Sequence, residues 1–381
     1  MLFSTDLGRT FGGGSRHLRG RKVPTNPSEG AFKLRNTPFY PSKMPSEILE
    51  GAKNHTRIST SFLDKILFSP ISGRHTFPSG TPAEILSAAK TMDLEELCVP
   101  LQAIKETIFI RGIDMQTKNY ITMLGTGNAL VTRCYNTCFT LHSMGGALML
   151  VDAGGGNGIL TQLERAGIQR EDITDLFVTH AHTDHLLGCI WMMRMALQFH
   201  RPLRVWSHRK VLDLLTGICR QILPKKNTDG IGSIVTMHCL EDGDTFEVGD
   251  MHLQCFDIQS TKERQFGFLA LLPDGQRLCC LGDEPFSPQC QQYAENADWL
   301  MSEAFCLYDD RDRFKPYEKN HSTALDAARL AERLHVRNLI LYHTEDQTLD
   351  TRRERYTAEA QSAFSGSVFV PEDLEQIILS M

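Results

Sequence analysis

The chain has 381 residues, of which 41% are hydrophobic and 23% are charged, and its formal net charge is −6. This length exceeds one typical domain, and the apolar content is ordinary for a globular protein, which excludes a wholly disordered or fibrous chain. No stretch of about 18 apolar residues occurs, and the N-terminus lacks a continuous apolar segment, so we expect neither a membrane span nor a secretory leader.

Positive charge is concentrated near the N-terminus. Residues 1–60 hold ten Lys and Arg against four Asp and Glu, a net charge of +6, whereas residues 61–381 hold thirty against forty-two, a net charge of −12. Nucleic-acid binding depends on neutralising many phosphates, so the acidic body argues against general nucleic-acid binding. The eleven cysteines are an odd number without C-x-x-C spacing, which predicts a reduced, cytoplasmic protein.

Residues 1–117 carry helix signals but no catalytic constellation. Helices are predicted near residues 45–53, 81–89 and 94–104, the second beginning with a Thr-Pro-Ala-Glu capping box. We interpret this region as a mainly helical or irregular appendage, either a cap, an oligomerisation element or a gate to a site elsewhere.

Regular α/β structure is predicted from about residue 118. Strands are expected at residues 120–124, 137–141 and 147–151, and the third ends in Asp152 followed by Ala-Gly-Gly-Gly. This glycine-rich run lacks both the Lys-Ser/Thr of a P-loop and the spacing of a dinucleotide fingerprint, so it does not indicate a nucleotide-binding loop.

Four potential metal ligands follow a β-branched, apolar run at residues 173–179. They are His180, His182, Asp184 and His185. Imidazole and carboxylate groups without thiolates are typical of catalytic rather than structural zinc sites. In an extended loop the first two project one way and the last two another, which favours two adjacent ions over one.

The rest of the chain alternates helices and strands. An apolar helix at 186–199 has three methionines that we assign to the core, and strands are predicted at 203–206, 233–238, 251–257, 266–272 and 278–282. Many strands separated in part by helices predict two sheets faced by helices.

The motifs occur in a specific order: LGTGNA, LMLVDAGGG, THAHTDHLLG, LCCLGDEP, MSEAF, NHSTALDAARLAERL and LILYHTED. Together they resemble the metallo-β-lactamase superfamily, and within it the ribonuclease Z-like phosphodiesterase branch. The resemblance implies an αββα sandwich over residues 118–381, the catalytic domain, and does not cover residues 1–117. It also implies a homodimer.

The resemblance implies a centre for one or two Zn²⁺ or Mn²⁺ ions per chain. His180 and His182 match ligands of the first metal, Asp283 matches a bridging carboxylate, and the second metal matches Asp184, His185 and His343. Asp152 is expected to hold a ligating histidine in place, the alternative being a simple turn aspartate.

One position departs from the family pattern. The family usually has another histidine before an aromatic-Gly-aromatic strand, but the segment here reads FDIQSTKERQFGFLAL, and Gln259 or Ser260 stands at the expected place. An amide oxygen is a weaker zinc ligand than imidazole. The first site is therefore expected to be weak, to prefer a harder ion such as manganese, or to be empty, unless His238 or His252 substitutes.

Catalysis requires an activated water and a proton for the leaving group. His321 matches the family's proton donor and Glu303 the carboxylate that orients it, while Asp184 could share the proton transfer. We therefore predict a metal-dependent hydrolase, most simply a phosphodiesterase using a metal-activated water.

A small or cyclic-nucleotide phosphodiester is favoured over tRNA as the substrate. The body is acidic, and the segment between His185 and Gln259 offers only Lys225-Lys226 as a basic cluster rather than a long basic arm. Three alternatives remain: a tRNA 3′-processing endoribonuclease of the ribonuclease Z type acting on RNA, a thioester or lactone hydrolase, and a catalytically reduced metal-binding regulatory protein.

Overall fold

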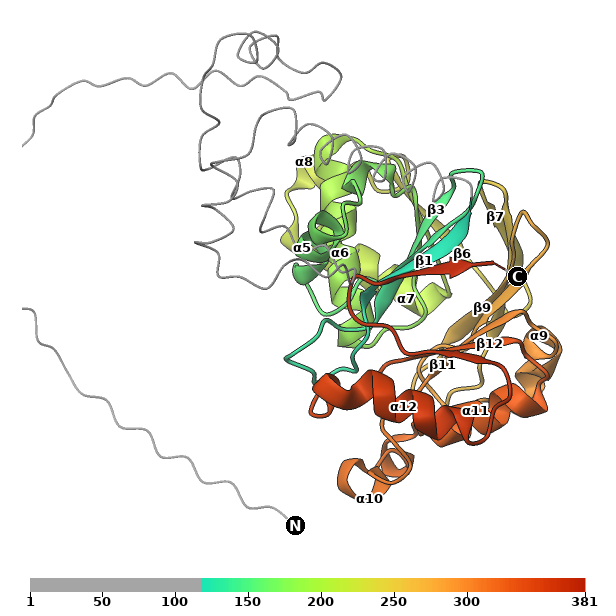
Figure 1. Cartoon of the computed structure of the whole chain (residues 1–381). Coiled ribbons are helices and arrows are strands. Elements are labelled where there is room, and N and C mark those ends of the chain that lie inside the picture. Colours follow the sequence, from blue (N-terminus) through green and yellow to red (C-terminus); the bar gives the residue numbers. More distant parts are fainter. Residues whose placement is uncertain (1–117, 381) are drawn as a thin grey trace, which may run out of the picture. The chain divides into compact units, whose positions relative to one another are not determined.

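A computed structural model describes residues 118–380. In this part of the chain two seven-stranded sheets pack against each other, and helices cover their outer faces (Figure 1). This confirms the predicted αββα sandwich. The appendage predicted over residues 1–117, with its three helices, lies outside the described residues.

The first sheet combines an antiparallel half with a parallel half. β14 to β3 pair antiparallel and β3 to β6 pair parallel. In spatial order the strands are β14 (Gln376–Leu379), β1 (Asn119–Gly125), β2 (Cys138–His142), β3 (Leu148–Val151), β4 (Asp175–Phe177), β5 (Leu203–Ser207) and β6 (Val235–Cys239).

The second sheet has the same division. β7 to β10 pair antiparallel, and β10 to β13 pair parallel. In spatial order the strands are β13 (Ser367–Phe369), β12 (Asn338–Tyr342), β11 (Trp299–Glu303), β10 (Arg277–Cys280), β9 (Phe266–Leu271), β8 (Met251–Asp257) and β7 (Thr245–Val248).

Helices connect the parallel strands and lie on the outside. The first sheet is covered by α5 (Gly158–Arg165), α6 (Thr183–Phe199), α7 (Arg209–Ile222) and the short α8 (Lys225–Thr228). The second is flanked by α9 (Gln291–Ala294), α10 (Arg311–Phe314), α11 (Ala324–Arg333) and α12 (Arg352–Gln361). Short 3₁₀ turns occupy Arg170–Asp172, Pro288–Cys290, Tyr317–Lys319 and Leu349–Thr351. Among the described helices, none has both the length and the apolar character needed to cross a membrane.

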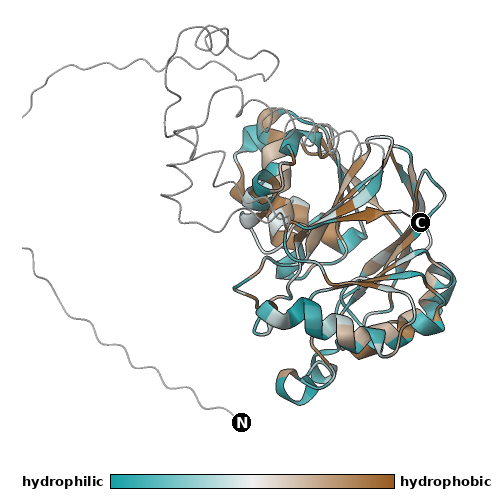
Figure 2. Cartoon of the chain, in the orientation of Figure 1, coloured by the Kyte–Doolittle hydropathy of each residue, from teal (hydrophilic) through white to brown (hydrophobic). Residues whose placement is uncertain are grey.

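The main core lies between the two sheets because alternate strand residues of both face inward. Ile121, Phe139 and Met149 of the first sheet join Phe268 and Ile340 of the second in one buried cluster. Figure 2 shows the hydrophobic residues gathered on the strands and hydrophilic residues on outer elements such as α12. Two further clusters pack the helices against each sheet, so the strands are buried on both faces.

Candidate metal centre

The predicted site residues are delivered by the carboxyl ends of parallel strands. Asp152 follows β3, His180 follows β4 at a distance of three residues, Asp283 follows β10, Glu303 ends β11 and His343 follows β12. Parallel neighbours end at the same edge of a sheet, so these side chains are brought to one edge of the sandwich.

The helix after β4 begins earlier than the sequence predicts. α6 starts at Thr183 rather than near residue 186, with His182 at its N-cap, so Asp184 and His185 lie in its first turn and not in a loop. A carboxylate is favourable at this end of a helix because the backbone N–H groups there are unpaired and the helix dipole is positive. The first turn therefore fixes two ligand candidates with helical geometry.

One group of four buried side chains could hold an ion. Asp184, His185, Asp283 and His343 each direct a nitrogen or oxygen to one point, with these atoms within 4.8 Å of one another. The Asp283 Oδ2 atom is 3.3 Å from the Nε2 atoms of both His185 and His343, and the Asp184 Oδ2 atom is 3.3 Å from His185 Nε2.

A second group shares one carboxylate with the first. His180, His182 and Asp283 also present ligand atoms within 4.8 Å of one another. Because Asp283 belongs to both groups, it occupies the place of a carboxylate between two ion positions. Neither group contains a cysteine, a donor set of nitrogen and oxygen that suits catalytic Zn²⁺ or Mn²⁺.

Buried polar atoms without partners support an ion at the first group. His185 Nε2 and both ring nitrogens of His343 are buried without a hydrogen bond, and the two Nε2 atoms face the Asp184 and Asp283 carboxylates only at 3.3–3.6 Å. Leaving such groups unpaired costs about 1–3 kcal/mol each, which a bound cation would offset. The donor chemistry and these orphaned nitrogens fit a divalent metal ion.

The charges of this cluster are strongly coupled. Burial alone would raise the pKa of Asp184 and of Asp283, but the neighbouring histidines lower both pKa values well below the usual range. Burial lowers the pKa of His180. For His185 burial is outweighed by Asp184 and Asp152, which raise its pKa. Both carboxylates are thus ionised and ready to bind a cation.

Asp152 holds two parts of the centre. Its Oδ2 atom is 2.7 Å from His185 Nδ1, and its carboxylate also accepts hydrogen bonds from the backbone N–H and the hydroxyl of Thr179, both at 2.8 Å. Since His185 Nδ1 is engaged here, the Nε2 atom is directed at the ion position. This contact is the one expected of a carboxylate that orients a metal-binding histidine.

Glu303 and His321 form a pair beside the metal cluster. The His321 Nδ1 atom lies 3.2 Å from Glu303 Oε2, and the imidazole stacks on the Phe305 ring at 4.8 Å. Burial lowers the pKa of His321, but the neighbouring Glu303 raises it by more, so the net pKa lies above the usual value. Glu303, His321 and His343 also present ligand atoms within 4.8 Å of one another.

Gln259 does not reach the cluster. Its side chain is exposed, its φ is 63°, and its backbone N–H bonds to Asp257 Oδ1 at 2.8 Å. The buried amide beside the centre is instead Gln265, directly before β9, whose Nε2 atom is 2.9 Å from His180 Nδ1 and also bonds to Asp283. Sequence reasoning missed this residue. His252 is exposed beside Glu247, and His238 stacks on Trp206, so neither joins the cluster.

A cavity of about 550 Å³ opens over the cluster. It is lined by Asp184, His182, Asp283, His321 and His343 from the centre, with Lys262, Lys319, Phe314 and the loop Asn128 to Val131 around them. Leu130 of this loop is 89% exposed. The cavity combines four of the candidate ligands, His321 and two cationic side chains.

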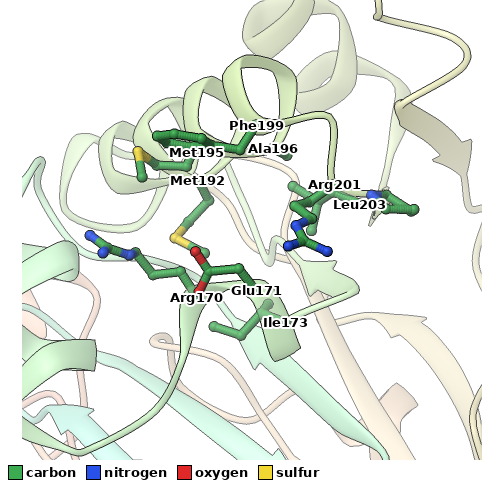
Figure 3. A pocket seen from close by; sticks show the side chains of 10 residues that line it. Arg170, Glu171, Ile173, Met192, Met195, Ala196, Phe199, Arg201 and Leu203 are labelled. Atoms are coloured by element: carbon green, nitrogen blue, oxygen red, sulfur yellow. The ribbon is translucent and has the colours of Figure 1, made fainter. Parts of the chain in front are cut away.

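A different pocket between α6 and the chain before β4 lacks these features. In Figure 3, Met192, Met195 and Phe199 of α6 face Arg170 and the segment that leads to β4. Its volume is about 20 Å³, room for roughly one water molecule. It holds no cluster of ligand atoms, so it is a packing gap. Met192 and Met193 belong to the core as predicted, whereas Met195 is only half-buried and lies outside the core clusters.

Known proteins similar to this chain include one matching family and several ribonucleases Z. The model of a family described as "Anti-Pycsar protein Apyc1" matches residues 119–364. A ribonuclease Z from Bradyrhizobium diazoefficiens is 24% identical, and the match covers 68% of this chain and 99% of the relative. A ribonuclease Z from Natronomonas pharaonis is 26% identical, over 66% of this chain and 95% of the relative.

Solved structures share the fold. The metallo-β-lactamase fold protein YhfI from Bacillus subtilis superposes with a TM-score of 0.55 at 17% identity, covering 69% of this chain and 99% of that protein. The short form of human tRNase Z gives a TM-score of 0.53 at 21% identity, covering 69% of this chain and all of that protein. Both matches extend over the sandwich described above.

Proposed function

The chain belongs to the family of the anti-Pycsar protein Apyc1 and is a ribonuclease Z-like member of the metallo-β-lactamase superfamily; from this premise we propose that it is a metal-dependent phosphodiesterase acting on small or cyclic nucleotides. The observation that carries the proposal is one cavity lined by members of both ligand groups and by His321, whose imidazole is paired with the buried Glu303.

The ligand groups would hold one or two Zn²⁺ or Mn²⁺ ions. Asp184, His185, Asp283 and His343 would hold one, and His180 with His182 and Asp283 the other. Ions bound there lower the pKa of a coordinated water and polarise phosphoryl oxygens, which is the chemistry that water attack on a phosphodiester requires.

The chain's own residues supply the remaining steps. His321, kept protonated by Glu303, donates its proton to the leaving oxygen. Lys262 and Lys319 place positive charge at the cavity wall, where they attract an anionic substrate. The Phe305 ring keeps the imidazole plane fixed by stacking, so the proton is delivered in one direction.

Cavity size and the lack of a basic arm within residues 186–258 support a small substrate. A volume of about 550 Å³ suits a ligand of nucleotide size, since small-molecule sites commonly measure about 300–1,000 Å³. Residues 186–258 form helices and strands of the sandwich itself. Among them Lys225 and Lys226, in α8, are the basic pair that the sequence singled out, and the first is paired with Asp229.

The experiment is a substrate panel on metal-reconstituted protein. We expect hydrolysis of bis-p-nitrophenyl phosphate and of at least one 3′,5′-cyclic nucleotide, abolished in Asp184→Ala and reduced at least about 100-fold in His321→Ala. Turnover of lactones or thioesters without any phosphodiester cleavage would overturn the proposal, and metal binding without turnover of any kind would favour a regulatory role.

tRNA 3′ processing is a second candidate because the curated relatives are ribonucleases Z. A precursor tRNA in the same panel separates the two: cleavage of precursor tRNA at a higher kcat/KM than any cyclic nucleotide would assign the RNA substrate. We also propose that residues 118–381 are the catalytic domain and that the protein is a homodimer. Light scattering of the full chain measures the latter, and a monomer mass would refute it.

A further inference from the structure

Gln265 lies opposite Asp283 because of the sheet register. β9 and β10 pair antiparallel with Phe268 opposite Cys280, and continuing that register by three residues brings Gln265 to Asp283. The side chain is 1% exposed. Gly282 makes room for it: a Cβ atom there would lie 3.1 Å from the amide, at a φ of 79° that suits glycine.

The orientation of the Gln265 amide follows from its neighbours. Its Nε2 atom contacts both Asp283 Oδ1 and His180 Nδ1, the latter at 2.9 Å, while its Oε1 atom is buried without a partner. Turning the amide over would place Oε1 against a carboxylate oxygen, two acceptors in contact. The nitrogen therefore faces Asp283, and it donates one hydrogen to each neighbour.

This orientation favours one tautomer of His180. An amide nitrogen can only donate, so His180 Nδ1 accepts, and the proton of the neutral ring sits on Nε2. That atom is 2.9 Å from His182 Nδ1, to which it donates. The two nitrogens that face the ion position at His180 and His182 thus satisfy each other, whereas His185 Nε2 and His343 Nε2 at the other position make no hydrogen bond.

Metal binding needs the other tautomer of His180, with a lone pair on Nε2 and the proton on Nδ1. An acceptor for that proton is present: Thr179 Oγ1 lies 2.9 Å from His180 Nδ1, and its own hydrogen can go to Asp152 Oδ2 at 2.8 Å. Thr179 therefore favours the tautomer that binds metal, and Gln265 favours the one that does not.

We propose that Gln265 is a positioning residue that makes the two ion positions unequal. One ion binds tightly at Asp184, His185, Asp283 and His343. The position at His180 and His182 binds a second ion weakly, because that ion must displace the hydrogen bond from Gln265 to His180. The inference rests on the metal dependence in the proposed function and not on the substrate.

Titration of the metal-free protein with Zn²⁺ against a chromophoric chelator tests the inference. Wild type should bind one ion tightly and a second at least about tenfold more weakly, the scale on which groups behind a ligand change metal affinity. Gln265→Met keeps the length of the side chain and removes the amide. It should tighten binding of the second ion by about tenfold or more and leave the affinity for the first ion within about threefold of wild type.

A gain of binding is informative because a damaged fold would lose affinity instead. Gln276→Met is the matched control: Gln276 is buried at the other end of the same strand pair and bonds to Trp299, so this variant should lose stability and leave both affinities unchanged. Thr179→Val should have the opposite effect and weaken binding of the second ion, and Thr179→Ser should keep the wild-type affinity.

Two equal ions in wild type, or a second ion no tighter in Gln265→Met, would overturn the inference. If Gln265→Met does not fold, an unchanged affinity for the second ion in Thr179→Val would also overturn the inference. Wild type that binds no ion at all would instead refute the metal dependence in the proposed function, so the two failures are distinguishable.

Discussion

Replacing Glu303 by glutamine should shift the pH dependence of catalysis. The isosteric amide keeps the size of the side chain and an oxygen for the Ser322 N–H, but it removes the negative charge 3.2 Å from His321 Nδ1. In wild type His321 has a raised pKa, so its proton is present below neutral pH and is lost only as pH rises through that raised value. The alkaline limb of kcat therefore reports His321.

The magnitude follows from the separation of the two charges. With an effective dielectric constant of about 20, unit charges 3.2 Å apart interact by about 5 kcal/mol, an upper figure because both charges are delocalised over several atoms. Opposite charges at such distances shift pKa values by about 1–3 units. Burial lowers the pKa of His321 and is no longer opposed by Glu303 in the variant, so the alkaline limb should move down by about 1–3 pH units.

The assay is kcat against pH for bis-p-nitrophenyl phosphate at saturating metal. Glu359→Gln is the control, because Glu359 also accepts backbone hydrogen bonds, from Tyr308 and Leu325 at 3.0 Å, but has no contact with His321. Its profile should match wild type. An alkaline limb that stays in place in Glu303→Gln, with kcat lowered equally at every pH, would show that His321 is not the proton donor.

Three further predictions concern the metal ligands and their support. Asp152→Asn should weaken metal binding by about 10–100-fold, because the amide no longer holds His185 Nδ1 as a carboxylate does. Competition with a chelator measures the metal affinity, and an unchanged affinity would show that Asp152 is only a turn residue. Metal binding at pH 7 should release about one proton, because the raised pKa of His185 keeps this residue protonated without metal. The proton release should disappear as pH rises through that pKa. Calorimetry in buffers of different ionisation enthalpy measures the release, and a heat of binding that does not depend on the buffer would contradict the prediction. Gly282→Ala should lower the free energy of unfolding by about 1–2 kcal/mol, owing to the positive φ and the crowding against Gln265, and a denaturant midpoint equal to wild type would contradict this.

Many of the strands and the ligand motifs could be predicted from the sequence because both depend on local patterns, whereas β7, β11, β13 and β14 were not predicted. The strand before His180 and the ends at Asp283 and His343 are marked by apolar runs that stop at a polar residue. The ends of helices and strands were harder to predict from the sequence. The helix after His182 begins three residues earlier than its apolar pattern, since polar residues such as Asp184 occupy its first turn for their bonds and charge rather than for burial.

The error at Gln259 has a different origin. Between Asp257 and Gln265 the chain turns through bends, with a left-handed residue at Gln259, and distance along such a segment does not report distance in space. A signal for Gln265 was nevertheless present. It precedes Phe266 and Phe268, which face the core, so the period of two puts Gln265 and Gly267 on the other side of the strand.

Both ligand groups draw on both sheets, because each combines Asp283 of the second sheet with residues that follow β4 of the first. Asp283 and His343 stand at the ends of β10 and β12, parallel to β11 between them, so their position is set by one continuous ladder of backbone hydrogen bonds. His180 and His182 lie on the five-residue loop 178–182 that joins β4 of the other sheet to α6. Gln265 joins the sheets at this point, since it belongs to the second sheet and bonds to His180 of the first. Any motion of one sheet against the other would alter both ion positions, so the predicted inequality between them rests on the tautomer of His180.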